Sequence, residues 1–280
     1  MLEIKGLHKI YGKYHALSGL DMNVSSGALY GFVGPNGAGK TTTIGMLSTL
    51  LLPSEGEIYI DGERLTRKNN RLKRKLSVIT QEYSMRQDMT MDEIMEYQGR
   101  LYFMPRKEIK HRTEELLEFC DLIKFRKRTV RKLSGGMKRK LMVCRALLTD
   151  PEILLLDEPT AGMDALSRRQ MWNLLRKLNG KNLTILLTTH YMEEAQNLCS
   201  RVALMDHGKL EEVNTPAGLI DSLGNYTVDE FAGDETHSHY FHSREEAIAY
   251  LSGLSGQASL RETTLEDVFV ERAGRHLMPS

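Results

Sequence analysis

The amino-acid sequence predicts an α/β fold with a mostly parallel β-sheet that is covered by helices on both faces. Short apolar runs of strand length alternate along the chain with segments of helical periodicity, and strands that are connected through helices pair in parallel. The run Ile153–Leu156 is apolar at every position, as expected of a central strand that is buried on both faces. At 280 residues the chain is long enough for one large domain and a smaller appended module.

Composition and charge exclude several classes of protein. The formal net charge is +1, so no overall field directs the chain to nucleic acid or to an anionic membrane. Three widely spaced cysteines argue against a disulfide framework or a zinc site and fit a reducing compartment. No stretch approaches the roughly 20 apolar residues that cross a bilayer, and the first residues lack the layout of a signal peptide. We expect a cytoplasmic protein that needs a partner for any role at a membrane.

The predicted elements follow from apolar runs, alternation and helix caps. Strands are expected over residues 2–7, 17–24, 28–33, 57–60, 76–80, 153–156, 183–188 and 202–205. Helices are expected over 41–51, 134–149 and 166–178.

Two segments interrupt the alternation of strands and helices. From about residue 83 to residue 132 the pattern is helical, which predicts a helical subdomain inserted into the core. After Pro216 the content of Gly, Ser and His rises and the periodicity weakens. We therefore predict a core over residues 1–216 and a small accessory module over 217–280.

A glycine-rich loop joins the predicted strand 28–33 to the helix that follows it. Gly34–Thr41 fits G-x-x-x-x-G-K-[ST], and it lies after a strand and before a helix, as that motif requires. Its glycines allow backbone N–H groups to surround phosphates at a helix N-terminus. Lys40 would reach the outer phosphates, and Thr41 would hold Mg²⁺ through its hydroxyl. The alternative is a chance glycine-rich turn, which the flanking strand and helix argue against.

Polar side chains follow the carboxyl ends of three further strands. Asp157 and Glu158 come after the strand 153–156, Gln81 follows another strand, and His190 closely follows a third. In open α/β sheets ligands bind beyond the carboxyl ends of the strands. The acidic pair suits a Mg²⁺ ligand, Asp157, and a base that polarises the attacking water, Glu158. A lone histidine is more often structural, but its place in this set favours a function.

The segment Leu133–Met137 predicts a second anion site. Ser134 is a good helix N-cap, and Gly135 and Gly136 expose N–H groups at the head of the helix. One triphosphate needs only one such cradle. The second cradle therefore suggests that it serves the nucleotide of another subunit.

Together with Tyr11 upstream, these motifs resemble the ATP-binding cassette family, the nucleotide-binding subunits of ABC transporters. The resemblance covers about residues 2–215. It consists of motifs in the order of that family: the Walker A loop Gly34–Thr41, the Q-loop glutamine Gln81, the signature Leu133–Met137, the Walker B residues Asp157 and Glu158, the D-loop around Asp164 and the switch histidine His190.

The resemblance implies a P-loop ATPase core with an N-terminal antiparallel β-subdomain, and a head-to-tail homodimer that holds two ATP molecules with Mg²⁺. In such a dimer Tyr11 would stack on adenine and Asp164 would link the two sites. The implied catalytic residues are Glu158, His190 and Gln81. The implied ATP-binding residues are Tyr11, Gly34, Pro35, Asn36, Gly37, Ala38, Gly39, Lys40, Thr41 and Thr42. Ser134, Gly135, Gly136 and Asp164 would contact the ATP of the other subunit, and Thr41, Gln81 and Asp157 would bind Mg²⁺.

The function implied by the resemblance is ATP hydrolysis that drives a separate integral-membrane permease, with the cassette peripheral on the inner face of the cell membrane. The segment 134–141 and the tail Thr264–Phe269 are similar to the drug-exporter branch, which implies export, although Thr263 stands where that branch usually has Pro. The main alternative is a non-transport cassette ATPase that acts on nucleic acid or ribosomes. The chain lacks the sustained heptads of the repair type and the two cassettes usual in the ribosomal type. A kinase or GTPase would explain neither the signature nor His190.

Three further patterns have plain explanations beside functional ones. The basic runs at residues 64–75 and 124–140 predict a solvated face, or one near lipid headgroups, rather than nucleic-acid binding, because no aromatic residues are interleaved. The methionines at residues 85–104 could fill the core or contact the permease. The histidines at 237, 239 and 242 have metal-like spacing, but an exposed loop or edge strand is favoured.

Overall fold

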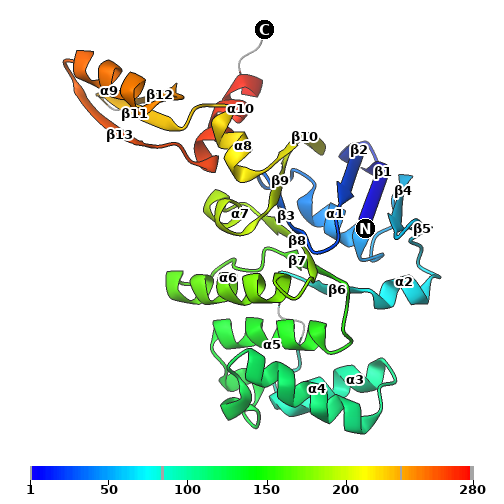
Figure 1. Ribbon diagram of the computed structural model, residues 1–280. Helices are drawn as coiled ribbons and strands as arrows, with labels where there is room; N and C mark the ends of the chain where they lie inside the picture. The colour runs from blue at the N-terminus through cyan, green and yellow to red at the C-terminus, as the bar shows by residue number, and fades with distance from the viewer. Residues whose placement is uncertain (1, 83–84, 234, 278–280) are drawn as a thin grey trace.

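The computed structural model describes residues 2–82, 85–233 and 235–277, the last five of them by their backbone alone. It contains three β-sheets of four, six and three strands, with helices packed around the largest one (Figure 1). The predicted α/β fold with a mostly parallel central sheet, an antiparallel N-terminal sheet and a helical insertion is confirmed.

The N-terminal sheet is antiparallel and has the strand order β2-β1-β4-β5. At its edge, Asp61 and Gly62 both have positive φ angles, 51° and 79°, and form the tight turn between β4 and β5. Two positive φ angles are what a two-residue hairpin turn requires. The strands are β1 (Leu2–Tyr11), β2 (Tyr14–Val24), β4 (Glu55–Ile60) and β5 (Glu63–Arg64).

The central sheet has the order β10-β9-β3-β8-β7-β6, and all neighbours are parallel except β10 and β9. Its register aligns the carboxyl ends of the parallel strands, with Val33 opposite Thr189 and Asp157 opposite Thr188. The loops that follow these strands therefore meet at one edge of the sheet. The strands are β3 (Leu29–Val33), β6 (Leu76–Ile79), β7 (Ile153–Asp157), β8 (Thr184–Thr189), β9 (Arg201–Asp206) and β10 (Lys209–Asn214).

Two hydrophobic clusters cover the two faces of this sheet. Along β7, Leu155 faces α1 and the N-terminal sheet, whereas Leu154 and Leu156 face the other cluster, which contains residues of α5, α6 and α7. The alternation follows from the pleat of a strand, whose successive side chains point to opposite faces. The helices are α1 (Lys40–Leu47), α5 (Gly135–Leu147), α6 (Ala165–Asn179) and α7 (Met192–Leu198), with the short α2 (Asn70–Arg74) before β6.

The helical insertion begins later than the sequence pattern indicates. We predicted helix from about residue 83, but none of the described residues of 81–90 is helical, and α3 starts at Met91. Thr90 and Glu93 form a capping box that sets this start, since each side chain accepts a hydrogen bond from the other residue's backbone N–H. Residues 83 and 84 lie outside the described residues. The insertion consists of α3 (Met91–Leu101), α4 (Arg106–Phe119) and two short 3₁₀ turns (Ile123–Phe125 and Val130–Lys132).

The methionines that follow Gln81 belong mainly to the core. Met85, Met91 and Met95 are buried, and Met89 and Met104 pack against the same cluster. These positions favour the core-filling explanation over a surface that contacts a partner.

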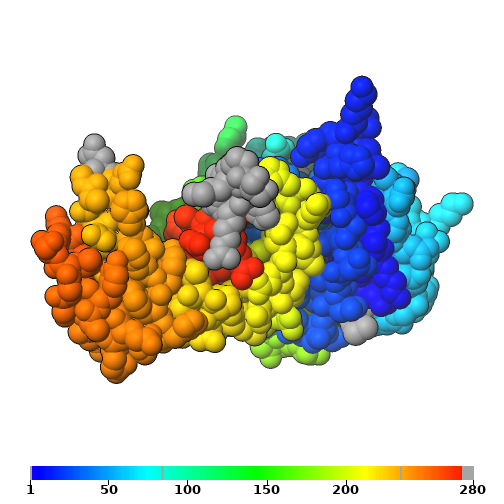
Figure 2. All heavy atoms as spheres, turned by 90° about the horizontal axis from the view of Figure 1, so that it is seen from above, coloured from blue at the N-terminus to red at the C-terminus, as the bar shows by residue number. Residues whose placement is uncertain are grey.

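The C-terminal part forms its own small sheet with the order β12-β11-β13. Figures 1 and 2 show this sheet and α9 at the side of the molecule opposite the N-terminal sheet. His237 and His239 lie on the edge strand β12, and among the described residues no group of metal-binding side chains is assembled. The elements are α8 (Pro216–Asp221), β11 (Tyr226–Ala232), β12 (Glu235–Phe241), α9 (Arg244–Gly253), β13 (Gln257–Glu262) and α10 (Leu265–Leu277).

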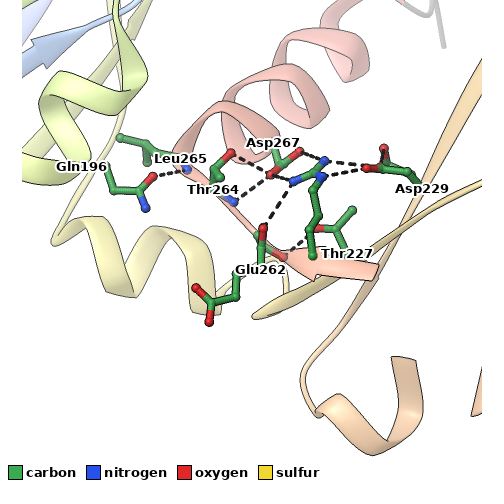
Figure 3. Close-up of polar contacts among 10 residues, drawn as sticks. Gln196, Thr227, Asp229, Glu262, Thr264, Leu265 and Asp267 are labelled. Carbon is green, nitrogen blue, oxygen red and sulfur yellow. Dashed lines mark hydrogen bonds and ion pairs between the residues drawn. The ribbon is translucent and has the colours of Figure 1, made fainter. Parts of the chain in front are cut away.

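Helix α10 joins this sheet to the core. Leu265 and Val268 are buried in the cluster that contains α7 and α8, and the Leu265 N–H donates to Gln196 of α7 at 2.9 Å. At the start of α10 the guanidinium of Arg261 donates to Asp267 at 2.7 Å and to Asp229 of β11 at 2.6 Å (Figure 3). A polar cluster therefore fixes the small sheet to the helix that docks on the core.

Candidate nucleotide site

The glycine loop between β3 and α1 has a shape that only glycine permits at two positions. Gly39 has a φ of 99°, and a Cβ there would lie 2.7 Å from the carbonyl oxygen of Ala16. A Cβ on Gly34 would lie 2.1 Å from the carbonyl oxygen of Met205. The loop is therefore packed tightly against its neighbours, and its backbone leads into the N-terminus of α1, where free N–H groups favour an anion.

Lys40 lies at the head of α1 and is buried, with an exposed fraction of 5%. Its Nζ donates to the carbonyl oxygens of Gly34 and Pro35 at 2.7 and 2.8 Å. Burial lowers the pKa of Lys40, while the nearby carboxylates of Glu158 and Asp157 act to raise it. The ammonium group is thus held across the loop, next to the acidic end of β7.

Asp157, at the end of β7, is joined to two hydroxyl groups. The Thr41 hydroxyl donates to Asp157 Oδ1 at 3.0 Å, and the Thr188 hydroxyl of β8 donates to the same oxygen at 2.6 Å. The predicted pair Thr41 and Asp157 is therefore brought together. Hydroxyl and carboxylate oxygens are the donors that Mg²⁺ prefers, so this set fits the ion chemically.

Glu158, Gln81 and His190 come from three different strand ends and meet at one carboxylate. His190 Nδ1 lies 3.0 Å from Glu158 Oε1, and Gln81 Nε2 donates to Glu158 Oε2 at 3.5 Å. The Glu158 side chain is 13% exposed and that of His190 is 37% exposed. The carboxylate is thus shielded but reachable, as a general base must be.

The backbone of Glu158 is held in an unusual conformation. Its φ is 48°, which is uncommon for a residue other than glycine and is found at functional sites. The Glu158 N–H donates to both oxygens of Thr188, each at 3.1 Å. Arg139 of α5 donates to the carbonyl oxygens of Glu158 at 3.2 Å and of Thr80 at 2.9 Å. These contacts hold the backbone of Glu158 between β8 and α5.

Arg139 corrects one prediction. We assigned it to a basic, solvated run, but its exposed fraction is only 2%, and it ties α5 to the ends of β6 and β7. The physical reason is its place on α5: Leu141, Met142 and Val143, which follow it, are also buried on that helix. A basic run contains no signal that separates its buried member from the exposed ones.

A pocket of about 220 Å³ opens above the glycine loop. Tyr11 and Tyr14 face each other across the hairpin of β1 and β2 at its rim, and they are 47% and 58% exposed. Tyr14, whose hydroxyl donates to the Gly37 carbonyl at 3.4 Å, was not among the predicted residues. The lining comprises Tyr11, Tyr14, Ala16, Asn36, Gly37, Gly39, Lys40, Thr41, Thr42 and Glu158.

The signature residues lie apart from this pocket, beside the D-loop. Ser134 caps α5 and accepts from the Met137 N–H at 3.3 Å, as predicted. Asp164 caps α6 through Ser167, and hydrogen bonds from that serine lower the pKa of Asp164. A Cβ on Gly136 would meet the same Ser167 at 3.3 Å. Ser134, Gly136 and Asp164 are all absent from the lining of the pocket at the glycine loop.

Fold and site together define a P-loop ATPase: a parallel sheet whose strand ends bring a phosphate-binding loop, an acidic pair and a histidine to one edge. Comparison with known proteins identifies the class more closely. The ABC transporter family matches residues 17–161. Nod factor export ATP-binding protein I of Cupriavidus metallidurans is 36% identical, over 99% of this chain and 98% of that protein.

Drug-resistance proteins and solved cassettes agree with this match. The daunorubicin/doxorubicin resistance ATP-binding protein DrrA of Streptomyces peucetius is 37% identical, over 94% of this chain and 78% of that protein. A dimeric cassette in a post-hydrolysis state bound to ADP and Pi has a TM-score of 0.68 and 27% identity, over 77% of this chain and 98% of that one. The chain belongs to the ABC transporter family. It is an ATP-binding subunit that hydrolyses ATP for transport, and cassettes of this family dimerise.

Proposed function

We propose that this chain works as a head-to-tail homodimer that drives export through a separate permease. The observation that carries the dimer is the separation of the two anion sites within one chain. The pocket at the glycine loop contains Lys40 and Glu158, whereas Ser134 and Gly136 lie beside Asp164, outside it. One copy therefore does not bring its own signature onto its own phosphates, and a second copy in the reverse orientation would do so.

The proposed roles of the site residues follow from their contacts. Thr41 and Asp157 would hold Mg²⁺, with Gln81 nearby, and the ion when bound would neutralise charge on the phosphates. Lys40 would exchange its two carbonyl partners for phosphate oxygens. Glu158 would accept the proton of the attacking water, and His190 would orient that carboxylate at 3.0 Å and contact the γ-phosphate.

The permease contact is proposed for a groove of about 560 Å³ between α2, the start of β6 and the helical insertion. Phe103 at its edge is 89% exposed and has a φ of 57°. Leu101 and Tyr102 line the same groove. An exposed apolar cluster of this kind marks an interaction site. Leu76 of β6 lines the groove, and Gln81, two residues beyond the end of β6, contacts Glu158. A partner in the groove would therefore be connected to the catalytic residues through β6.

The names of the relatives support a role in export, and the permease partner would determine where the cassette lies in the cell. The relatives are named for Nod factor export and for daunorubicin resistance, which favours export over the alternative action on nucleic acid or ribosomes. No helix among the described residues is long and apolar enough to span a bilayer. We propose that the cassette is held on the inner face of the cell membrane by its permease.

The test is purification of the tagged chain from solubilised membranes, with mass spectrometry of the integral protein that accompanies it. We expect a permease with wild-type protein and with Tyr97→Asp, a control at an exposed position of α3 outside the groove. Phe103→Asp should lose it while keeping the wild-type melting temperature. Recovery of ribosomes or DNA in place of a membrane protein would overturn the proposal.

A further inference from the structure

Helix α7 contains a fully buried acid that has no part in the site described above. Glu194 has an exposed fraction of 0%, and burial raises the pKa of its carboxyl group. Its Oε1 accepts from the Thr160 hydroxyl at 2.8 Å and from the Trp172 indole N–H at 3.0 Å. Its Oε2 is buried and makes no hydrogen bond of regular geometry among the described residues. Polar contacts with Thr189, Thr160 and Trp172 act to lower the pKa, but burial outweighs them. An apolar side chain would avoid this desolvation cost, so the acid needs another explanation.

The first partner of Glu194 belongs to the loop of the proposed base. Thr160 is buried and lies two residues after Glu158. The Ala161 N–H donates to the Glu158 carbonyl at 3.2 Å, which closes a turn over these residues. The loop that bears Glu158 begins where β7 ends, at Asp157. The hydrogen bond from Thr160 to Glu194 holds this loop on the C-terminal side of Glu158.

The helix that bears Glu194 starts directly after the proposed switch histidine. The rings of His190 and Tyr191 are in contact, with 4.1 Å between their centroids and an angle of 39° between their planes. The Tyr191 N–H donates to the Thr189 hydroxyl at 3.0 Å. The guanidinium of Arg168 also lies over the Tyr191 ring, 4.7 Å from its centroid. The direction of α7 thus sets where the imidazole of His190 lies.

We propose that Glu194 is a positioning residue that links the loop of Glu158 to the helix after His190. It thereby keeps the carboxylate of Glu158 and the imidazole of His190 at the relative position that hydrolysis requires. It does not touch the glycine loop or the adenine side of the pocket. Loss of its bond to Thr160 therefore affects the hydrolytic step and leaves ATP binding as it is. The inference rests on the roles proposed above for Glu158 and His190.

The two partners of the same oxygen allow a matched comparison. Thr160→Val keeps the size of the side chain and removes only the donor to Glu194, and we expect kcat for ATP to fall by about tenfold at unchanged KM, since a displacement of about 1 Å can cost up to 100-fold. Trp172→Phe removes the other donor, which comes from α6. It should lower the melting temperature and leave kcat unchanged.

Substitutions of Glu194 itself complete the experiment. Glu194→Leu should repeat the loss seen in Thr160→Val, and Glu194→Gln, whose amide oxygen still accepts both hydrogen bonds, should restore most of kcat. If Glu194→Leu does not fold, the comparison of Thr160→Val with Trp172→Phe decides alone. Unchanged kcat in Thr160→Val, or equal losses in Thr160→Val and Trp172→Phe, would overturn the inference. Glu158→Gln is assayed in parallel to test the proposed base separately. If Glu158 is the base, this variant loses hydrolysis whether or not Glu194 is a positioning residue. If it keeps hydrolysis, the proposed function fails and not only the role of Glu194.

Discussion

The polar cluster that fixes the C-terminal sheet to α10 offers a measurable perturbation, Arg261→Met. The guanidinium donates twice to Asp267, at 2.7 Å each, and twice to Asp229, at 2.6 and 3.3 Å. Both carboxylates are shielded, with side-chain exposures of 11% and 12%. Methionine would keep much of the apolar stem and leave two acids facing each other without a cation (Figure 3).

The loss of stability that we expect in Arg261→Met lies between the loss for a buried ion pair and the loss for a surface ion pair. Removal of one partner from a buried pair costs about 3–5 kcal/mol. The Arg261 side chain is 38% exposed, so water screens part of the attraction and would rehydrate the acids. We therefore expect the free energy of local unfolding to fall by about 2 kcal/mol, which corresponds to about 30-fold faster amide exchange.

The pH dependence has a definite sign. Burial acts to raise the pKa of Asp267, but hydrogen bonds from Arg261 and Thr264 outweigh it, and the pKa lies below its ordinary value. Asp229 shows the same balance, with bonds from Arg261 and Ser238. Such groups stabilise the folded state above their unfolded pKa of about 4, and the contribution is lost as the pH falls through the lower folded pKa. The difference in the free energy of local unfolding between wild type and Arg261→Met should be largest near pH 7 and should decrease below about pH 4.

Hydrogen exchange with mass spectrometry measures this effect locally, because the C-terminal sheet can open without the core. Peptides from β11 and β13 should exchange faster in Arg261→Met, while peptides from β3 and β7 should not change. Arg244→Met, at an exposed position at the start of α9, is the control. Equal exchange in the two variants would refute a stabilising role for the cluster.

Two further predictions concern the pocket. Gly39→Ala places a Cβ at a φ of 99° and 2.7 Å from the Ala16 carbonyl oxygen. It should therefore lower the free energy of unfolding by about 1–3 kcal/mol and abolish ATP binding measured by calorimetry. Wild-type affinity for ATP would contradict the loop geometry. Tyr11→Ala should weaken ATP binding by about tenfold through loss of base stacking, and Tyr11→Phe should not; equal affinities of the two variants would exclude stacking on Tyr11.

The parts of the site that the sequence predicted are those whose signals are local. The glycine loop, the acidic pair after β7 and the histidine after β8 each follow a strand directly, and the parallel register then brings them together. The cap at Ser134 is likewise contained in a few consecutive residues. These features can be predicted from the sequence because residues that directly follow parallel strands lie at the same edge of the sheet.

The parts that it missed depend on packing between distant segments. Glu194 stands in the first turn of a helix, where an acid is usually explained by the helix dipole, and only the approach of Thr160 and Trp172 shows that it is buried. The C-terminal sheet has weak alternation because one face bears the polar cluster of Arg261 and Asp229 in place of apolar residues. Patterns of hydrophobicity do not record such contacts.

Sedimentation velocity of Glu158→Gln measures whether a second copy of the chain completes the ATP site. This variant should bind ATP and lose hydrolysis by at least about 100-fold, so that ATP and Mg²⁺ convert it from monomer to dimer. Adding Gly136→Asp, which places a negative charge in the exposed cradle of the signature, should keep it monomeric under the same conditions. A Glu158→Gln protein that stays monomeric at saturating ATP would contradict a site shared between two copies, and one that hydrolyses ATP at the wild-type rate would contradict Glu158 as the base.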